Sequence, residues 1–240
     1  MISHRVKLRR REEVAEGTVA FFFEKPEGFR FTAGQFARFT LIAPPETDDE
    51  GNSRTFSIAS APYEADLMIA TRMRDTAFKR VLKSMSIGSE IDFKGPYGRM
   101  TLHEDAARPA VFMTGGIGIT PFRSLAVEAA AAGCDHRLHL FYSNRRPEDA
   151  AFLNELTALS RGNKNYTFIP TMTGATGSKV PWTGETGYIN SEKLARFVGD
   201  LKAPIYYIAG PPGMVNAMRA ALADAGVDEA AIRAEEFAGY

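Results

Sequence analysis

The chain has 240 residues with 29 basic and 29 acidic side chains, a neutral balance that gives no electrostatic argument for nucleic acid or an anionic membrane as a partner. No apolar run approaches the roughly 20 residues of a membrane span, and the start of the chain has none of the features of a signal peptide. The single cysteine, Cys134, excludes an internal disulfide and an iron–sulfur cluster, so we expect a cytoplasmic protein in which any redox chemistry uses a dissociable organic cofactor.

Residues 1–104 consist of short runs rich in β-branched and aromatic residues, separated by turn residues. Closely spaced short strands of this kind predict a small antiparallel β-barrel. A short helix around Thr76–Met85 would cap the open end of that barrel, and Gly95–Gly98 has the composition of a tight turn. The expected strands are the basic run Arg5–Arg11 and the runs Thr18–Phe23, Phe36–Ile42, Arg54–Ser60, Leu67–Met73 and Glu90–Lys94.

After Arg108-Pro109, strand-like runs alternate with helical ones. This βαβ rhythm is typical of a parallel sheet. The predicted fold class is therefore two-domain, with an antiparallel β-barrel over residues 1–104 followed by an α/β parallel-sheet domain over residues 105–240. The strands expected in the second domain are Val111–Met113, Leu138–Tyr142, Thr167–Ile169 and Ile205–Ile208, and the helices are Phe122–Ala132, Pro147–Ser160, Ser191–Val198 and Gly213–Ala225.

The segment Thr114–Pro121 joins the first of these strands to its helix and contains three glycines. Glycine lets a backbone approach a bulky ligand, and Pro121 suits a first helical turn, where its missing N–H costs nothing. A strand, a glycine turn and a helix N-terminus together form a candidate site for a phosphate. The spacing is Gly-x-Gly-x-x-Pro and not the Gly-x-Gly-x-x-Gly of ordinary dinucleotide folds, and a plain strand–helix turn is the alternative.

A second candidate site lies in the strand Arg54–Ser60. Arg54 offers a fixed fork of charged donors that suits a diphosphate. Phe56, two residues on, faces the same side of the strand with a flat ring, whereas Ser57 places a hydroxyl on the other side. Taken in isolation, this pattern also fits an exposed arginine beside a core phenylalanine.

The segment Arg72–Lys79 precedes and opens the short helix of the barrel. Asp75 or Thr76 can cap that helix, which would leave its first N–H groups free for another anion. A plain capped surface helix is the alternative. The basic residues Arg72, Arg74, Lys79, Arg80 and Lys83, together with Arg5–Arg11, would suit an acidic partner protein as a basic rim, although a solvated surface accounts for them as well.

Taken together, these motifs resemble those of the ferredoxin–NADP⁺ reductase superfamily, in which an antiparallel flavin barrel precedes a nicotinamide-dinucleotide domain. The resemblance covers nearly the whole chain and implies a stand-alone FAD-dependent NAD(P)H reductase without an iron–sulfur domain. The motifs follow the family's order: RTFSIAS at Arg54–Ser60, the capped helix, GPYG at Gly95–Gly98, GIGITP at Gly116–Pro121, AGPPGM at Ala209–Met214 and EEF at Glu235–Phe237.

On the flavin side, the resemblance assigns Arg54 to the diphosphate and Phe56 to the face of the isoalloxazine ring. It places the Ser57 hydroxyl near flavin N5, where Ser57 and Glu235 are the candidate catalytic residues. Ser60 favours FAD over FMN. The FAD-binding residues implied by the motifs are Arg54, Thr55, Phe56, Ser57, Ser60, Arg72 and Thr76.

On the dinucleotide side, the resemblance assigns Glu235 to the family's acidic position near the nicotinamide and Phe237 to its stacking aromatic position. Tyr240 competes with Phe237 for the stacking role, and a frayed terminus is the alternative for Tyr240. The remaining residues implied to bind NADPH or NADH are Thr114, Gly115, Gly116, Ile117, Gly118, Thr120, Pro121, Arg145, Gly210, Pro211 and Met214.

Two positions depart from the family's pattern. Phe56 replaces the usual tyrosine, which keeps the stacking ring and loses a phenolic hydrogen bond. Ala209 replaces a common cysteine, which removes any contact between its sulfur and the nicotinamide. We expect hydride transfer to be slower or differently tuned, but not lost.

The choice between NADPH and NADH stays open on the sequence. Arg145 and Arg146 follow the second strand of the dinucleotide domain, where they would meet a 2′-phosphate, and no carboxylate stands there for a ribose 2′-hydroxyl. Against this, the Ser-Arg pair of NADPH-using relatives has no counterpart at Met172-Thr173.

The function implied by the resemblance is hydride transfer from NAD(P)H to FAD, followed by electron transfer to a ferredoxin, a flavodoxin, an oxygenase component or a small acceptor. A monomer that binds neither metal, nucleic acid nor membrane is expected. One alternative is a nucleotide-binding electron-transfer subunit of a larger redox complex, without turnover of its own. Another is a module that binds a nucleotide and transfers nothing.

Overall fold

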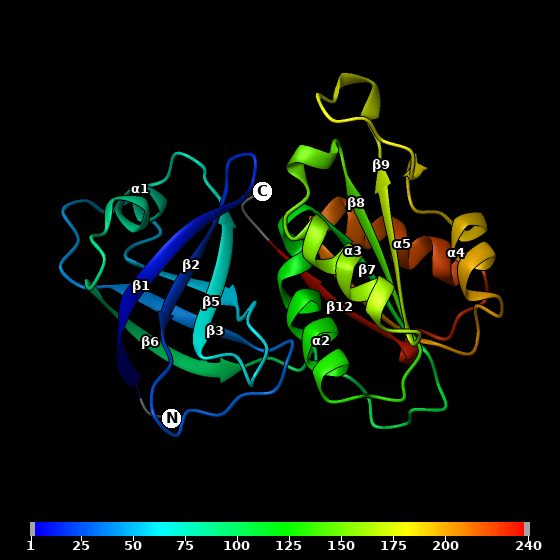
Figure 1. Cartoon of the computed structure of the whole chain (residues 1–240), viewed down its shortest axis with the longest axis horizontal. Coiled ribbons are helices and arrows are strands. Elements are labelled where there is room, and N and C mark those ends of the chain that lie inside the picture. Colours follow the sequence, from blue (N-terminus) through cyan, green and yellow to red (C-terminus); the bar gives the residue numbers. More distant parts are fainter. Residues whose placement is uncertain (1–2, 238–240) are drawn as a thin grey trace.

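In the computed structural model, which describes residues 3–237, the amino-terminal half is a six-stranded antiparallel sheet that curls into a barrel (Figure 1). Its strand order is β4-β3-β6-β1-β2-β5. Alternation decides which side chains are inside, since Phe39 and Leu41 of β3 are buried while Arg38 is exposed. The strands are β1 (Ser3–Ala15), β2 (Thr18–Glu24), β3 (Phe36–Leu41), β4 (Ser53–Ser57), β5 (Asp66–Arg72) and β6 (Glu90–Tyr97).

The segment after β4 brings the two edges of this sheet together. The amide of Ala59 donates to the carbonyl of Met68 on β5 at 2.7 Å. The amide of Met68 in turn donates to the hydroxyl of Ser60 at 3.0 Å. Helix α1 (Ala77–Ser84) packs Phe78 and Leu82 into the core of the barrel. The barrel is therefore closed directly after the strand that carries Arg54, Phe56 and Ser57.

The structure lengthens one predicted strand of the barrel, shortens another, since the strand predicted over Arg54–Ser60 ends at Ser57, and corrects one predicted turn. The basic run at the start of the chain belongs to β1, which extends to Ala15 because it pairs with β2 as well as β6. Gly95–Tyr97, predicted as part of a tight turn, continues β6, because Tyr97 pairs with Phe36 on β3.

The carboxyl-terminal half is a six-stranded parallel sheet with the order β10-β9-β8-β7-β11-β12. Helices α2 and α3 lie on one face and α4 and α5 on the other (Figure 1). Every residue of β7 and β11 is buried, as expected for strands covered on both faces. The elements are β7 (Ala110–Gly115), α2 (Ile119–Ala131), β8 (Leu138–Asn144), α3 (Leu153–Gly162), β9 (Tyr166–Met172), β10 (Glu185–Thr186), α4 (Ser191–Val198), β11 (Ile205–Gly210), α5 (Pro212–Asp224) and β12 (Ile232–Glu236).

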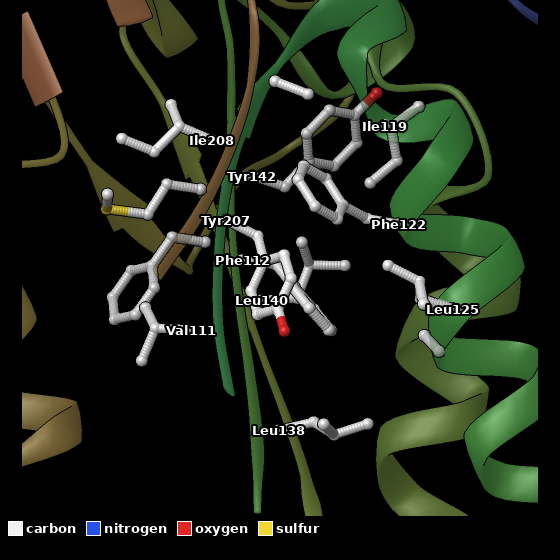
Figure 2. Close-up of a cluster of buried hydrophobic side chains, with 14 of the residues drawn as sticks. Val111, Phe112, Ile119, Phe122, Leu125, Leu138, Leu140, Tyr142, Tyr207 and Ile208 are labelled. Atoms are coloured by element: carbon white, nitrogen blue, oxygen red, sulfur yellow. The ribbon is translucent and has the colours of Figure 1, made fainter. Parts of the chain in front are cut away.

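Apolar side chains from the central strands and α2 form the core between sheet and helix (Figure 2). The rings of Phe112 on β7 and Phe122 on α2 stack with centroids 5.0 Å apart. Tyr207 on β11 meets Phe112 edge-on at 5.3 Å. The hydroxyl of Tyr142 on β8 donates to the carbonyl of Gly116 at 3.0 Å. This core thereby fixes the glycine turn relative to the ends of the strands.

Three elements of the second domain also differ from the prediction, one of them the two-residue strand β10, which pairs with β9 and has no counterpart among the predicted strands. The helix expected over Pro147–Ser160 is divided, because Phe152 adopts a left-handed backbone with φ of 61° and α3 begins only after it. The strand β12 is absent from the sequence-based expectation, and it pairs in parallel with β11 at the edge of the sheet. The connection between β6 and β7, residues 98–109, contains the predicted domain boundary.

Candidate functional site

A cleft of about 570 Å³ lies between the two domains. One wall comes from β4, β5 and the start of α1, and the other from the start of α2 and the end of β12. The fold thus brings together motifs that are far apart in the sequence. The residues singled out in the sequence that line the cleft are Arg54, Thr55, Phe56, Ser57, Arg72, Thr76, Ile117, Thr120, Glu235 and Phe237.

The side chain of Arg54 is held by the acidic loop that precedes β4. Its Nη2 donates to Oδ1 of Asp48 at 2.8 Å, and its Nε lies 3.0 Å from Oε2 of Glu50. Its Nη1 donates to the carbonyl oxygens of residues 50, 51 and 53. The hydrogen bond from Arg54 lowers the pKa of Asp48. The guanidinium is therefore oriented and already pairs with an anionic group.

Thr76 is the cap of helix α1. Its hydroxyl accepts from the amide of Lys79 at 3.4 Å, and its own backbone is extended. The alternative cap, Asp75, pairs instead with the guanidinium of Arg80. Of the two residues that the sequence offered for this position, the structure selects Thr76.

The first amide of α1 points at the same carboxylate that pairs with the arginine. The amide of Ala77 donates to Oδ2 of Asp48 at 3.2 Å, while Oδ1 accepts from Arg54. A single carboxylate therefore bridges the guanidinium and the helix N-terminus. These are the two groups that together would accept a diphosphate.

Aromatic rings and a hydroxyl lie next to this anion-binding end. Phe56 is half-buried, with its ring centroid 5.9 Å from that of Phe78 on α1. Ser57, which is 8% exposed, pairs across the sheet with Phe36. Phe36, Phe56 and Ser57 all line the cleft. This wall therefore offers flat apolar surfaces with a hydroxyl beside them.

The opposite wall begins at the glycine turn. Gly116–Gly118 form a 3₁₀ turn between β7 and α2, and Pro121 lies in the first turn of the helix as predicted. The hydroxyl of Thr120 donates to the carbonyl of Ile117 at 3.0 Å. Among residues 3–237, no side chain caps the start of α2. The amide of Ile119, the first of the helix, donates within the turn to the carbonyls of Gly116 and Ile117, so the turn attracts an anion chiefly through the helix dipole.

Packing within the protein accounts for one of the glycines. A Cβ on Gly118 would lie 2.4 Å from the carbonyl oxygen of Ala209 and 2.7 Å from the hydroxyl oxygen of Thr114. These two atoms are themselves hydrogen-bonded at 2.8 Å. The small residue is required here by the close approach of the turn to β11 and not by the ligand alone.

Replacing Gly118 by alanine is therefore expected to destabilise the domain by about 1–3 kcal/mol, the usual cost of overpacking a well-filled site. Thermal or urea unfolding of the variant measures this change. Gly162→Ala is the matched control, because a Cβ on Gly162 at the end of α3 would meet nothing within 4 Å. Equal stability of Gly118→Ala and the parent would contradict the packing argument.

Residues at the ends of β7 and β11 and on α5 pack against the glycine turn. Thr114 is fully buried on β7. A Cβ on Gly115 would lie 2.7 Å from the sulfur of Met214 on α5, and one on Gly210 would lie 3.3 Å from the Met214 methyl carbon. Pro211 precedes α5 directly. The structure thus packs these residues against the turn within the second domain, and none of them lines the cleft.

Glu235, near the end of β12, and Phe237, which follows that strand, both line the cleft. Oε1 of Glu235 lies 3.7 Å from the position that a Cβ would take on Gly98 of the barrel. Burial raises the pKa of Glu235, so its carboxyl keeps a proton to higher pH than a free one. The amide of Phe237 donates to the carbonyl of Gly210 at 3.0 Å. Tyr240, the alternative stacking residue, lies outside the described residues.

Ser60 does not line the cleft. It is buried behind β4, where its hydroxyl accepts from the amide of Met68. Its carbonyl accepts from the hydroxyl of Ser124 on α2 at 2.7 Å. Ser60 therefore has one hydrogen bond within the barrel and one to the second domain.

Arg145 and Arg146 follow β8 and differ in what they contact. Arg146 pairs with Asp149 at 2.7 Å and with Glu16 of the barrel at 3.1 Å. Arg145 is exposed, and within residues 3–237 no carboxylate forms an ion pair with it. Of these two arginines, Arg145 is therefore the one whose side chain is available to a ligand.

Several residues that line the cleft were not predicted as site residues from the sequence. Two of them are Arg74 and Lys79. Burial, together with the nearby charges of Arg74 and Arg54, lowers the pKa of Lys79. The sequence signal was the position of Lys79 in the first turn of α1, facing the same side as Thr76. Asp48 had no comparable signal, because its loop contains several carboxylates and only the fold shows which one reaches Arg54.

Comparison with known proteins agrees with this architecture. The family model "Oxidoreductase NAD-binding domain" matches residues 112–220. Ferredoxin–NADP reductase B of Sorangium cellulosum is 31% identical over 208 residues, which cover 82% of each chain. The reductase component of propane 2-monooxygenase from Rhodococcus jostii is 30% identical over 201 residues, which cover 80% of this chain and 52% of that relative.

Among solved structures, the ferredoxin–NADP⁺ reductase of Neisseria gonorrhoeae with bound FAD and NADP has a TM-score of 0.80 at 24% identity and covers 98% of both chains. The chain therefore belongs to the ferredoxin–NADP⁺ reductase superfamily, and the predicted family and two-domain fold are confirmed. It spans about half the length of several relatives that it matches, such as the propane 2-monooxygenase reductase. Within residues 3–237, no helix could cross a membrane, and no cluster of three or more His, Cys, Asp or Glu side chains could hold a metal ion.

Proposed function

We propose that this protein is an FAD-dependent NAD(P)H reductase that passes electrons to a separate acceptor. The observation that carries the proposal is the cleft between the domains. On one wall, the Asp48 carboxylate bridges the Arg54 guanidinium and the first amide of α1, and the opposite wall contains the glycine turn. In this proposal residues 1–104 bind FAD and residues 105–240 bind the dinucleotide. Relatives that are named as ferredoxin–NADP reductase and as reductase components of oxygenases support it.

The residues on the barrel side fit FAD. The carboxylate of Asp48 acts as a stand-in anion, since it takes hydrogen bonds from both groups that a diphosphate would engage. Arg54 and the N-terminus of α1, capped by Thr76, would hold the diphosphate, and Thr55 and Arg72 line the same wall. Phe56 would lie against the ring, with the Ser57 hydroxyl beside it.

The residues on the other wall would hold NAD(P)H through the turn Gly116–Pro121, supported from below by Thr114 and Met214. FAD, when bound, would supply the chemistry for accepting a hydride from NAD(P)H and for passing the two electrons on one at a time. The chain binds and orients the two rings and excludes water, and Phe237 shields the seam. Glu235 is the proposed proton-holding group, because burial raises its pKa.

NADPH is the proposed reductant. Arg145 is exposed at the carboxyl end of β8, where the adenosine ribose binds in dinucleotide domains. A guanidinium there would pair with the 2′-phosphate that distinguishes NADPH from NADH.

Replacing Arg145 by alanine is expected to raise the KM for NADPH about fivefold, the effect of losing an exposed ion pair of about 1 kcal/mol, and to leave the KM for NADH unchanged. Steady-state reduction of ferricyanide with each dinucleotide measures both values. Arg137→Ala is the matched control, because Arg137 is exposed at the opposite end of the same strand. A parent enzyme that strongly prefers NADH would contradict the assignment.

The acceptor is proposed to be a ferredoxin, a flavodoxin, an oxygenase component or a small molecule. The basic rim considered for an acidic partner is partly neutralised, because Arg5 pairs with Asp92, Arg9 with Asp66 and Arg80 with Glu46. Within residues 3–237, Arg72, Arg74 and Lys79 form no ion pair with a carboxylate, and these three side chains line the cleft, where an acidic partner would meet them. We further propose a cytoplasmic monomer.

The proposal is tested by the absorbance spectrum of the purified protein. A yellow protein that holds FAD and bleaches when NADPH or NADH is added under anaerobic conditions is the expected result. Re-oxidation by added ferredoxin, flavodoxin or ferricyanide then identifies the class of acceptor. A protein that stays colourless after incubation with FAD would overturn the proposal, and one that binds FAD but does not bleach would be a binding module.

A further inference from the structure

A buried arginine links the two domains next to the cleft. Arg123 lies on α2 and is only 6% exposed. Its Nε and Nη2 donate to the two carboxylate oxygens of Glu155 at 3.0 and 2.5 Å. Its Nη1 and Nη2 donate to the two oxygens of Glu64 at 2.6 and 3.0 Å. Every nitrogen of the guanidinium is thus engaged, and two carboxylates share one positive charge.

The partners of Arg123 come from both domains. Glu155 lies on α3, whereas Glu64 lies in the barrel, on the segment between β4 and β5. Nη1 of Arg123 also donates to the carbonyl of Ala59 on that segment at 2.9 Å. The neighbouring residue, Ser124, donates its hydroxyl to the carbonyl of Ser60 at 2.7 Å. Consecutive residues of α2 therefore hold consecutive residues of the barrel.

This contact is close in sequence to both walls of the cleft. Ser60 is three residues after Ser57, and Arg123 is three residues after Thr120. Ser57 and Thr120 both line the cleft. Three residues span about one helical turn on α2, so a rigid helix start carries the constraint from Arg123 to the glycine turn.

We propose that Arg123 is a positioning residue, which sets the separation of the flavin wall and the dinucleotide wall and thereby the rate of hydride transfer. This inference rests on the proposed function. Hydride transfer needs the reacting atoms at roughly 3–3.5 Å, and a misplacement of about 1 Å costs up to about a hundredfold in rate. A planar guanidinium can chelate two carboxylates at once, which an ammonium group cannot do.

Arg123→Lys is the discriminating variant, because it keeps the charge and loses the double chelation. Stopped-flow reduction at saturating NADPH is expected to be at least about fivefold slower, with the half-saturating NADPH concentration and the FAD affinity within twofold of the parent. Hydrogen exchange, measured without dinucleotide, is expected to become faster in residues 59–64 and 119–124. Glu64→Gln, which leaves Arg123 in place, serves if Arg123→Lys does not fold, with the same expectations.

Glu16→Gln is the matched control. It removes a second ion pair between the domains, with Arg146 at 3.1 Å, that lies on the surface and outside the cleft lining. The control is expected to match the parent in rate and in exchange. Reduction of Arg123→Lys at the parent rate, or an equal loss in Glu16→Gln, would overturn the positioning role. Absence of flavin reduction in the parent itself would overturn the proposed function instead, and the exchange data would still test the link.

Discussion

Replacing Arg54 by alanine is expected to weaken FAD binding about a hundredfold. Arg54 offers charged donors to the position where the Asp48 carboxylate now lies, and a hydrogen bond to a charged group is worth about 1.5–3 kcal/mol. Losing one such bond therefore corresponds to roughly ten- to 150-fold in the dissociation constant. Titration of the FAD-free protein with FAD, followed by flavin fluorescence, measures the change.

The same site offers an opposing variant. The Asp48 carboxylate accepts hydrogen bonds from the two groups that are proposed to hold the diphosphate. Asp48→Asn therefore removes a competing negative charge while keeping the side-chain volume. Tighter FAD binding, by about threefold or more, is expected from Asp48→Asn, since a like charge near the diphosphate would be removed. Weaker binding in Asp48→Asn would mean that the carboxylate serves to orient Arg54, and unchanged binding in Arg54→Ala would remove Arg54 from the FAD site.

Replacing Ser57 by alanine is expected to leave FAD bound and to slow flavin reduction by at least about tenfold, which corresponds to about 1.4 kcal/mol of barrier. Ser57 is nearly buried in the cleft wall beside Phe56, and in the proposed reaction its hydroxyl would both donate and accept hydrogen bonds near the reacting atoms. Anaerobic stopped-flow reduction by NADPH measures the rate.

Ser53→Ala is the matched control for this prediction. Ser53 lies on the same strand, and its hydroxyl bonds to that of Thr40 at 2.7 Å, outside the cleft lining. The control is expected to reduce its flavin at the parent rate. Reduction of Ser57→Ala at the parent rate would exclude a catalytic role for its hydroxyl.

Much of the fold follows from local patterns. The alternation in Phe36–Ile42 predicted β3, and the buried run before the glycines predicted β7, because period-two and continuous apolar runs are readable without tertiary contacts. The break at Phe152 was not readable, since a phenylalanine carries no local signal for a left-handed backbone. Nor was β12, whose mixed composition becomes a strand only through pairing with β11.

The sequence by itself determined the family, the order of the domains and most residues of the cleft, because each of those depends on short motifs whose spacing is set along the chain. The tertiary structure alone decided that Asp48 bridges Arg54 and the start of α1, and that Arg123 joins Glu64 to Glu155. These contacts connect residues far apart in sequence, such as Arg123 and Glu64 on opposite domains. No local periodicity records such a pairing, since it exists only after two separately folded surfaces meet.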